Sequence, residues 1–217
     1  MNKVTVMAVA IALAMSASTV SAATVVNGSF EDIGTTTLNG SGWSFFNSIP
    51  GWTGDPTGEV QSAPTIGQVD AQDGQYYVEL DTNQNSTIYQ DISFNAGSYA
   101  LSFFYSPRVN NPSQGTNDMT YSVAGLLSGS VNSAPNSGFP YETWTEVTDR
   151  FSVTTAGTYR LSFSGAGAQN ESNGCGDCGA LIDNVSIAAV PLPAGALLLL
   201  TGLAGLGLSR RRKANVA

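Results

Sequence analysis

The segment Ala96-Gly97-Ser98-Tyr99-Ala100-Leu101-Ser102-Phe103 recurs sixty positions later as Ala156-Gly157-Thr158-Tyr159-Arg160-Leu161-Ser162-Phe163. Within each copy, large apolar side chains alternate with small or polar ones, which is the pattern of a strand that packs one face on a core. Each copy also follows a second alternating stretch, which ends at Phe94 in one case and at Val153 in the other. This repeat predicts two similar hairpins with the Ala-Gly pair near each turn, in two sheets that face each other.

The rest of the middle region reads as further short strands, because apolar alternation is interrupted by clusters of Gly, Asn, Pro and Ser and no stretch shows helical periodicity. The fold class predicted is all-β, an antiparallel jelly-roll β-sandwich. The strands expected are 75–80, 87–94, 98–105, 119–123, 144–153, 158–164 and 180–187.

The N-terminal residues 1–22 are typical of a secretory signal peptide. A single cation, Lys3, precedes an apolar run and then small residues that end at Ala22 and Ala23, so cleavage is expected after one of these two alanines. The alternative is a short membrane anchor, but the run stops well short of the roughly 20 apolar residues that span a bilayer.

The C-terminal segment, residues 189–217, mirrors this order. The motif Val190-Pro191-Leu192-Pro193-Ala194 precedes an apolar run from Ala196 to Leu208 and the cations Arg210, Arg211, Arg212 and Lys213. From Ala188 to Leu208, a helix would reach roughly 30 Å. The cations act as a stop-transfer signal and place the preceding residues outside the inner membrane.

This order of motif, apolar helix and basic cluster resembles the PEP-CTERM sorting signal in its V-P-L-P-A variant. The resemblance implies a protein held transiently in the inner membrane until an exosortase-type protease cuts near the motif, and then a location at the cell surface or outside the cell. The alternative left open is a permanent single-span anchor.

Residues 23–188 are expected to form one domain, since roughly 165 residues suit a single core. All 16 acidic residues of the chain lie there, against only Arg108, Arg150 and Arg160 of the 8 basic ones, so three positive and sixteen negative charges leave about −13. Such a charge argues against nucleic acid as a partner. The chain has no histidine, which excludes Ser-His-Asp triads and histidine-ligated zinc.

Cys175 and Cys178 lie in a Gly-rich loop of the sequence Cys-Gly-Asp-Cys-Gly. The spacing is compatible with a thioredoxin-like redox pair, but that motif normally opens a helix after a strand. In an exported chain, oxidising conditions favour a structural disulfide between the two.

Several further motifs resemble landmarks of the domain-of-unknown-function-642 family, in the order expected for it. They are Asn27-Gly28-Ser29-Phe30-Glu31, Ile49-Pro50-Gly51-Trp52, the run 73–81, Ile88-Tyr89-Gln90-Asp91, the run 102–108 and Leu181-Ile182-Asp183-Asn184-Val185-Ser186. The resemblance implies a galactose-binding-like jelly roll, similar to carbohydrate-binding modules, in an extracellular or wall-associated protein.

Asp183 shares the parity of Leu181, Val185 and Ile187, so its carboxylate is expected on or beside the core, where an unpaired charge is costly. Similar carbohydrate-binding modules carry a Glu after their N-terminal Asn-Gly-x-Phe and an Asp in their last strand, both on a structural calcium. The resemblance therefore implies calcium on Glu31 and Asp183. Pairing with Arg108 or Arg160, and simple hydrogen bonding, are the alternatives.

Aromatic residues outside the expected strands offer surfaces on which sugar rings stack. Trp43, Phe46 and Tyr141 are the predicted carbohydrate-binding residues, whereas Trp52 is expected to close the core. Asp73, Glu79, Asp81 and Asp91 could supply a glycosidase pair, but chance pairs are common in an acidic domain and no catalytic residue is predicted. The leading hypothesis is a non-catalytic, polysaccharide-binding surface or matrix protein. A structural or adhesive protein is the second and a glycoside hydrolase the third.

Overall fold

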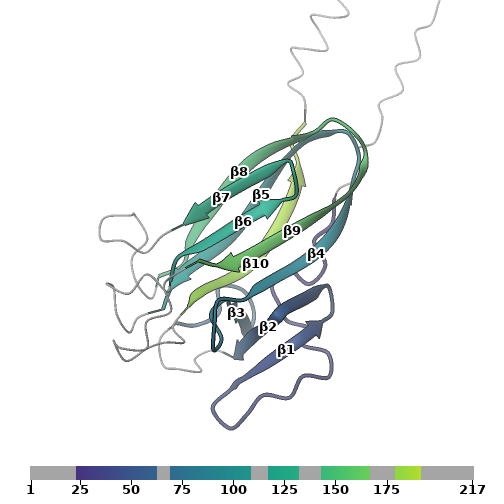
Figure 1. Ribbon diagram of the computed structural model, residues 1–217. Coiled ribbons are helices and arrows are strands. Elements are labelled where there is room, and N and C mark those ends of the chain that lie inside the picture. Colours follow the sequence, from purple (N-terminus) through teal and green to yellow (C-terminus); the bar gives the residue numbers. More distant parts are fainter. Residues whose placement is uncertain (1–22, 63–68, 109–116, 132–142, 167–178, 192–217) are drawn as a thin grey trace, which may run out of the picture.

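The computed structural model describes residues 23–62, 69–108, 117–131, 143–166 and 179–191 (Figure 1). Every strand pairing in this part of the chain is antiparallel. The strands are β1 (Trp43–Ile49), β2 (Trp52–Ser62), β3 (Tyr76–Glu79), β4 (Thr87–Phe94), β5 (Gly97–Pro107), β6 (Met119–Val123), β7 (Leu127–Val131), β8 (Thr145–Val153), β9 (Gly157–Gly165) and β10 (Ala180–Ala189).

The strands form two layers that share β2. The order is β7-β6-β9-β4-β2-β3-β10-β5-β8, with β1 added to β2. The first residues of β2, Thr53 to Asp55, pair with β4, whereas its last residues, Glu59 to Ser62, pair with β3. We call the layer β2-β3-β10-β5-β8 the β5 sheet and the layer β7-β6-β9-β4 the β9 sheet. The predicted all-β jelly-roll sandwich is confirmed.

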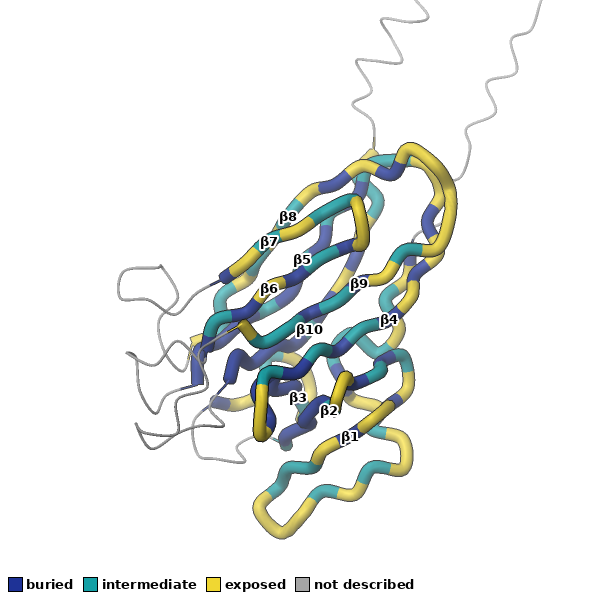
Figure 2. Tube along the Cα trace, viewed as in Figure 1, coloured by how far each residue is buried: buried dark blue, intermediate teal, exposed yellow. Residues whose placement is uncertain are grey.

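The core lies between the two sheets and is rich in aromatic rings. Phe103 of β5 and Phe163 of β9 meet edge to face with 5.0 Å between ring centroids, and Trp52 lies 6.1 Å from Phe163. Trp52 is only 2% exposed, so the expectation that it closes the core is confirmed. Figure 2 shows the buried positions alternating with exposed ones along the strands, as a sandwich requires.

The repeated segments lie in opposite sheets, but the predicted hairpins are wrong. Among the described strands, β4 pairs with β9 and β5 pairs with β8, so neither β4 with β5 nor β8 with β9 forms a ladder. The chain instead crosses from one sheet to the other at each Ala-Gly pair. The reason is the packing of rings between the layers, since Phe94 contacts both Tyr99 and Tyr159 and so keeps the flanking strands apart.

An equivalent hydrogen bond closes each crossing, from a tyrosine hydroxyl to the carbonyl four residues before it. The Tyr99 hydroxyl donates to the Asn95 carbonyl at 2.9 Å, and the Tyr159 hydroxyl donates to the Thr155 carbonyl at 2.8 Å. We call the end of the sandwich that holds both crossings the corner end. The chain also leaves β10 there, because Ala189 pairs with Tyr99 and the Val190 N–H donates to the Ser98 carbonyl at 2.8 Å. Figure 1 shows both ends of the described chain at this end of the molecule.

The seven expected strands all occur, within two residues of their predicted bounds. The sequence pattern missed β1, β2 and β7. In β2, the residues Gly54, Pro56 and Gly58 break the apolar alternation, and β7 reads Leu-Ser-Gly-Ser-Val with one buried residue. In the part of the chain described, no helix is long and apolar enough to span a bilayer. The predicted signal peptide and the tail beyond Pro191 lie outside the described residues. The helix expected from Ala188 to Leu208 is wrong at its start, because Ala188 and Ala189 belong to β10 and pair with β5.

Candidate functional site

Asp183 anchors the loop that precedes β3. Its Oδ2 accepts the backbone N–H groups of Gln72 at 2.8 Å and Asp73 at 3.0 Å, and its Oδ1 accepts the N–H of Asn184 at 2.6 Å. The residue is fully buried. Burial raises the pKa of Asp183 to about 7, against the lowering effect of these three hydrogen bonds.

Glu31 holds the other half of the same loop. Its Oε1 accepts the backbone N–H groups of Gln75 and Tyr76, both at 2.8 Å. Gly74, between the two groups of donors, has φ +75°, and a Cβ there would overlap the Glu31 carboxylate. Only glycine suits this position, both for its backbone conformation and for the close approach.

The two predicted calcium ligands therefore act on one loop, each through backbone donors. Neither pairs with Arg108 or Arg160, whose carboxylate partners are Glu79 and Asp91. Within the described ranges, no group of three or more His, Cys, Asp or Glu side chains is arranged to hold a metal ion. Calcium on Glu31 and Asp183 stays a prediction.

The predicted sugar-stacking residues Trp43 and Phe46 differ in their exposure to solvent. Trp43 lies partly exposed on β1, and its ring centroid is 5.2 Å from that of Phe45, which is 37% exposed. Phe46 faces the opposite way, is 4% exposed and packs against Gly58, where any Cβ would overlap its ring. A ring this deep offers no face to a sugar, so Phe46 is a core residue. We call Trp43 and Phe45 the aromatic pair.

Other predicted positions fall outside the described residues. These are Tyr141, Cys175, Cys178, Leu192, Pro193, Ala194, Arg210, Arg211, Arg212 and Lys213. Of the sorting motif, Val190 and Pro191 are described, at the point where the chain leaves the corner end.

The register places the aromatic pair beside a set of polar side chains. Trp43 is the cross-strand partner of Gln61, and Phe45 is that of Glu59. Glu59 in turn pairs with Glu79, and Gln61 with Tyr77. Because directly opposed residues of an antiparallel pair project to the same side, these six side chains lie on one face of β1-β2-β3, the outer face of the β5 sheet.

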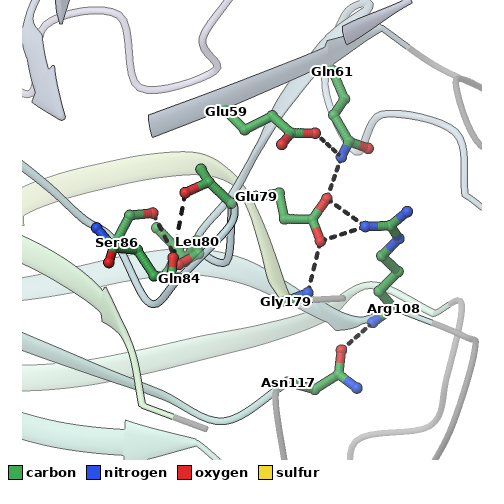
Figure 3. A network of polar contacts seen from close by, with 10 residues as sticks. Glu59, Gln61, Glu79, Leu80, Gln84, Ser86, Arg108, Asn117 and Gly179 are labelled. Carbon is green, nitrogen blue, oxygen red and sulfur yellow. Dashed lines mark hydrogen bonds and ion pairs between the residues drawn. The ribbon is translucent and has the colours of Figure 1, made fainter. Parts of the chain in front are cut away.

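Four polar side chains of this face and its border form a continuous network, drawn in Figure 3. Arg108 Nη1 donates to Glu79 Oε1 at 2.7 Å and to Oε2 at 3.0 Å. The backbone N–H of Gly179 donates to Glu79 Oε1 at 2.6 Å. Gln61 Nε2 donates to Glu79 Oε2 and also to Glu59 Oε1, the latter at 2.9 Å. We call Glu59, Gln61, Glu79 and Arg108 the polar network.

The electrostatics of the network centre on Glu79, which is fully buried. Burial raises the pKa of Glu79 to about 8, opposed by Arg108 and assisted by Glu59. Burial and the Glu79 charge also raise the pKa of Tyr77 above its ordinary range. Gln61 uses its amide nitrogen twice, whereas its buried Oε1 has no hydrogen-bond partner in the part of the chain described.

An aromatic cluster borders the network on its other side. Trp144 lies edge-on to Tyr77 with 5.8 Å between centroids, and its Nε1 donates to the Asp70 carbonyl at 2.7 Å. Val69 and Leu181 pack with Tyr77 in the same cluster. The face therefore runs from the exposed aromatic pair, across the polar network, to a covered apolar cluster.

Sequence reasoning missed Phe45, Glu59, Gln61 and Tyr77 as members of this face. One signal was available for Glu59 and Gln61, since they alternate with the buried Val60 and so share a side. Once a strand was assigned to residues 52–62, this alternation would have placed both residues opposite the core. Glu79, named above among the carboxylates of a possible glycosidase pair, is paired with Arg108.

No family model and no curated protein match the chain. Among solved structures it is similar to the carbohydrate-binding module TmCBM61 in complex with beta-1,4-galactotriose, at 16% identity and TM-score 0.47, over 76% of this chain and 96% of that one. A second is a CBM4 structure, at 15% identity and TM-score 0.44, over 76% and 99%. A third is the C-terminal CBM6 of LamC from Zobellia galactanivorans, at 22% identity and TM-score 0.37, over 59% and 87%. Scores this low carry no inference about ligand or activity.

Proposed function

We propose that the sandwich is a non-catalytic carbohydrate-binding domain and that sugar is bound at the aromatic pair, beside the buried polar network. The observation that carries the proposal is the register, which sets Trp43 beside Gln61 and Phe45 beside Glu59. An apolar ring next to hydrogen-bonding groups matches a sugar, which has an apolar face and an edge of hydroxyls.

The polar network supports this surface from within the domain. Glu59 is 7% and Gln61 0% exposed, so neither side chain is open to a sugar, and the buried Gln61 Oε1 has no hydrogen-bond partner among the described residues. Gln61 Nε2 donates to Glu79, which is paired with Arg108. These contacts hold β2, the strand that pairs with the aromatic pair, so little further ordering is needed on binding.

The same contacts favour binding over hydrolysis. Glycosidases need a carboxylic acid and a carboxylate that both reach the scissile bond. Both oxygens of Glu79 already accept hydrogen bonds from Arg108, Gly179 and Gln61. Asp91 is held at the surface by Arg160, in the other sheet.

A glycan array probed with the segment 23–191 tests the proposal. Binding should then be measured for Trp43→Ala and Phe45→Ala, each of which should weaken the affinity for the best glycan by about tenfold or more. Tyr89→Ala is the matched control, because Tyr89 is an aromatic residue on the outer face of the β9 sheet, under Arg160. A loss of affinity in the control alone would contradict the assignment of the face.

Two other outcomes separate the competing functions. A folded domain that binds no glycan on the array would favour a structural or adhesive role. Release of shorter products from a bound glycan, abolished by a carboxylate substitution, would show a glycoside hydrolase instead.

We propose in addition that the chain is exported through residues 1–22 and sorted through residues 189–217 by an exosortase-type protease. The support is the sequence order at both ends and the position of Val190 at the last hydrogen bond of β10. In the source organism, the mature chain should end near Val190 and lie outside the inner membrane. Recovery of intact Lys213 on a membrane-bound surface protein would show a permanent anchor.

A further inference from the structure

The corner end differs in charge from the rest of the domain. The segments that build it, residues 92–100, 150–159 and 188–191, contain none of the 16 acidic residues of the chain, although Asp91 and Asp149 directly precede two of them. The domain as a whole carries about −13. A surface without carboxylates is the part of such a domain that an anionic surface repels least.

Arg150 is the second unusual feature of this end. Arg108 is paired with Glu79, and Arg160 is paired with Asp91. Within the described part of the chain, the third arginine, Arg150, forms no ion pair, and it is exposed on β8. Its guanidinium is therefore available to an external anion.

The surroundings of Arg150 form a shallow depression beside the departing chain. The depression has a volume of about 270 Å³ and is lined by Arg150, Ser98, Ser152 and Val190, with the edges of Tyr99 and Phe151. Two hydroxyls next to a cation are donors suited to a phosphate group. The Val190 N–H is already used by the Ser98 carbonyl, which fixes the chain at this wall.

The distance to the membrane is limited by the same hydrogen bond. Only residues 191–195 separate Val190 from the apolar run that begins at Ala196. Five extended residues reach at most about 17 Å. This step rests on the proposed sorting function, in which that run lies in the inner membrane. The corner end is then the part of the domain that is tethered next to the bilayer.

From these observations we propose that the corner end docks on the outer surface of the inner membrane before processing, with Arg150 bound to a lipid phosphate in the depression beside Val190. Anionic lipid attracts a cation that lies near the membrane surface. Figure 1 shows β1 at the end of the molecule opposite to the two crossings, so docking at the corner end leaves the aromatic pair distant from the bilayer, although Arg150 lies on the same outer face of the β5 sheet.

The test uses the full chain reconstituted in vesicles of phosphatidylethanolamine and phosphatidylglycerol that contain a headgroup spin-labelled lipid. Thr154→Trp places a fluorophore at the corner end, and Gly40→Trp places one before β1, where a side chain meets no atom within 4 Å. Relative to the parent chain, the tryptophan added at 154 should be quenched several-fold more than the one added at 40. In the 154 background, Arg150→Gln should reduce this quenching, and Arg160→Gln, which removes the same charge, should not.

The outcomes separate this inference from the proposed sorting function. A chain that does not float with the vesicles would refute the membrane anchor and this proposal together. A chain that floats, but in which both tryptophans are quenched equally, would refute the docked orientation alone. Unchanged quenching in Arg150→Gln would refute the role of Arg150.

Discussion

The buried ion pair of the polar network permits a sharp test of the candidate site. Arg108→Met removes the guanidinium that lies 2.7 Å and 3.0 Å from the two oxygens of Glu79, while Glu79 itself is fully buried. At a pH above about 8, where Glu79 is ionised, the carboxylate then stays desolvated without its counter-charge. Loss of one partner of a buried pair costs about 3–5 kcal/mol of unfolding free energy.

Arg160→Met is the matched control in the same molecule. Arg160 makes two hydrogen bonds to Asp91, at 2.8 Å and 3.0 Å, but both side chains are about half exposed, at 48% and 50%. Water can replace the lost partner, so the cost of this substitution should be close to the error of the measurement. Urea unfolding of residues 23–191, followed by tryptophan fluorescence, gives both free energies.

A double variant separates charge from packing. In Arg108→Met with Glu79→Gln, the neutral amide at 79 needs no counter-charge, and its oxygen still accepts the Gly179 N–H. Much of the lost stability should therefore return. The reasoning is refuted if Arg108→Met costs no more than Arg160→Met, or if the double variant is no more stable than Arg108→Met alone.

Four further predictions concern the loop before β3 and the two crossings. Gly74→Ala should lower the unfolding free energy by about 2 kcal/mol or more. Gly125→Ala should cost less, because both glycines have positive φ but only Gly74 faces a carboxylate. Equal costs of the two substitutions in chemical denaturation would contradict this prediction. Because the pKa of Asp183 is raised in the folded state, the folded domain binds the Asp183 proton more tightly than the unfolded chain does. The free energy of unfolding should therefore fall as pH rises from 3.8, the ordinary pKa of Asp, through about 7. Asp183→Asn should flatten this pH dependence in unfolding curves. Tyr99→Phe should cost about 1–3 kcal/mol, since it leaves a part-buried carbonyl without its donor, and Tyr159→Phe should cost less because its hydrogen bond is exposed; the reverse order would refute the comparison. Finally, if calcium is bound, a chelator should lower the melting temperature, and an unchanged melting curve would remove the metal from the structure.

The sequence was most informative where a strand has one clean apolar face. Leu101, Phe103, Leu161 and Phe163 alternate with small residues, and this local pattern is enough to predict both the strands and their inward sides. It is not enough to choose partners, because the same alternation suits a hairpin and a crossing between sheets. The choice depends on which rings meet at the corner end, and such contacts are tertiary.

The candidate site was less predictable for a related reason. Glu59 and Gln61 follow Gly54, Pro56 and Gly58, whose turn-like character hid the strand that carries them. Phe46 and Trp43 are three residues apart in a stretch read as a loop, and only the pairing of β1 with β2 shows that one is in the core and the other on the surface. For Glu31 and Asp183, the sequence predicted the location of two carboxylates with a common role, but backbone donors cannot be read from residue types.

The near-identity of the two crossings bears on how the chain finds its native pairing. Strands β5 and β9 present almost the same inward side chains, so each offers an acceptable surface to a partner of the other during folding. Native partners are also far apart in sequence, because β4 pairs with β9, and β5 pairs with β8 and β10. Sheets built from such non-local pairings form slowly, and incompletely paired strands are open to other molecules. The repeated segments therefore favour one competing assembly above others, a domain-swapped dimer in which two chains exchange β4 or β5.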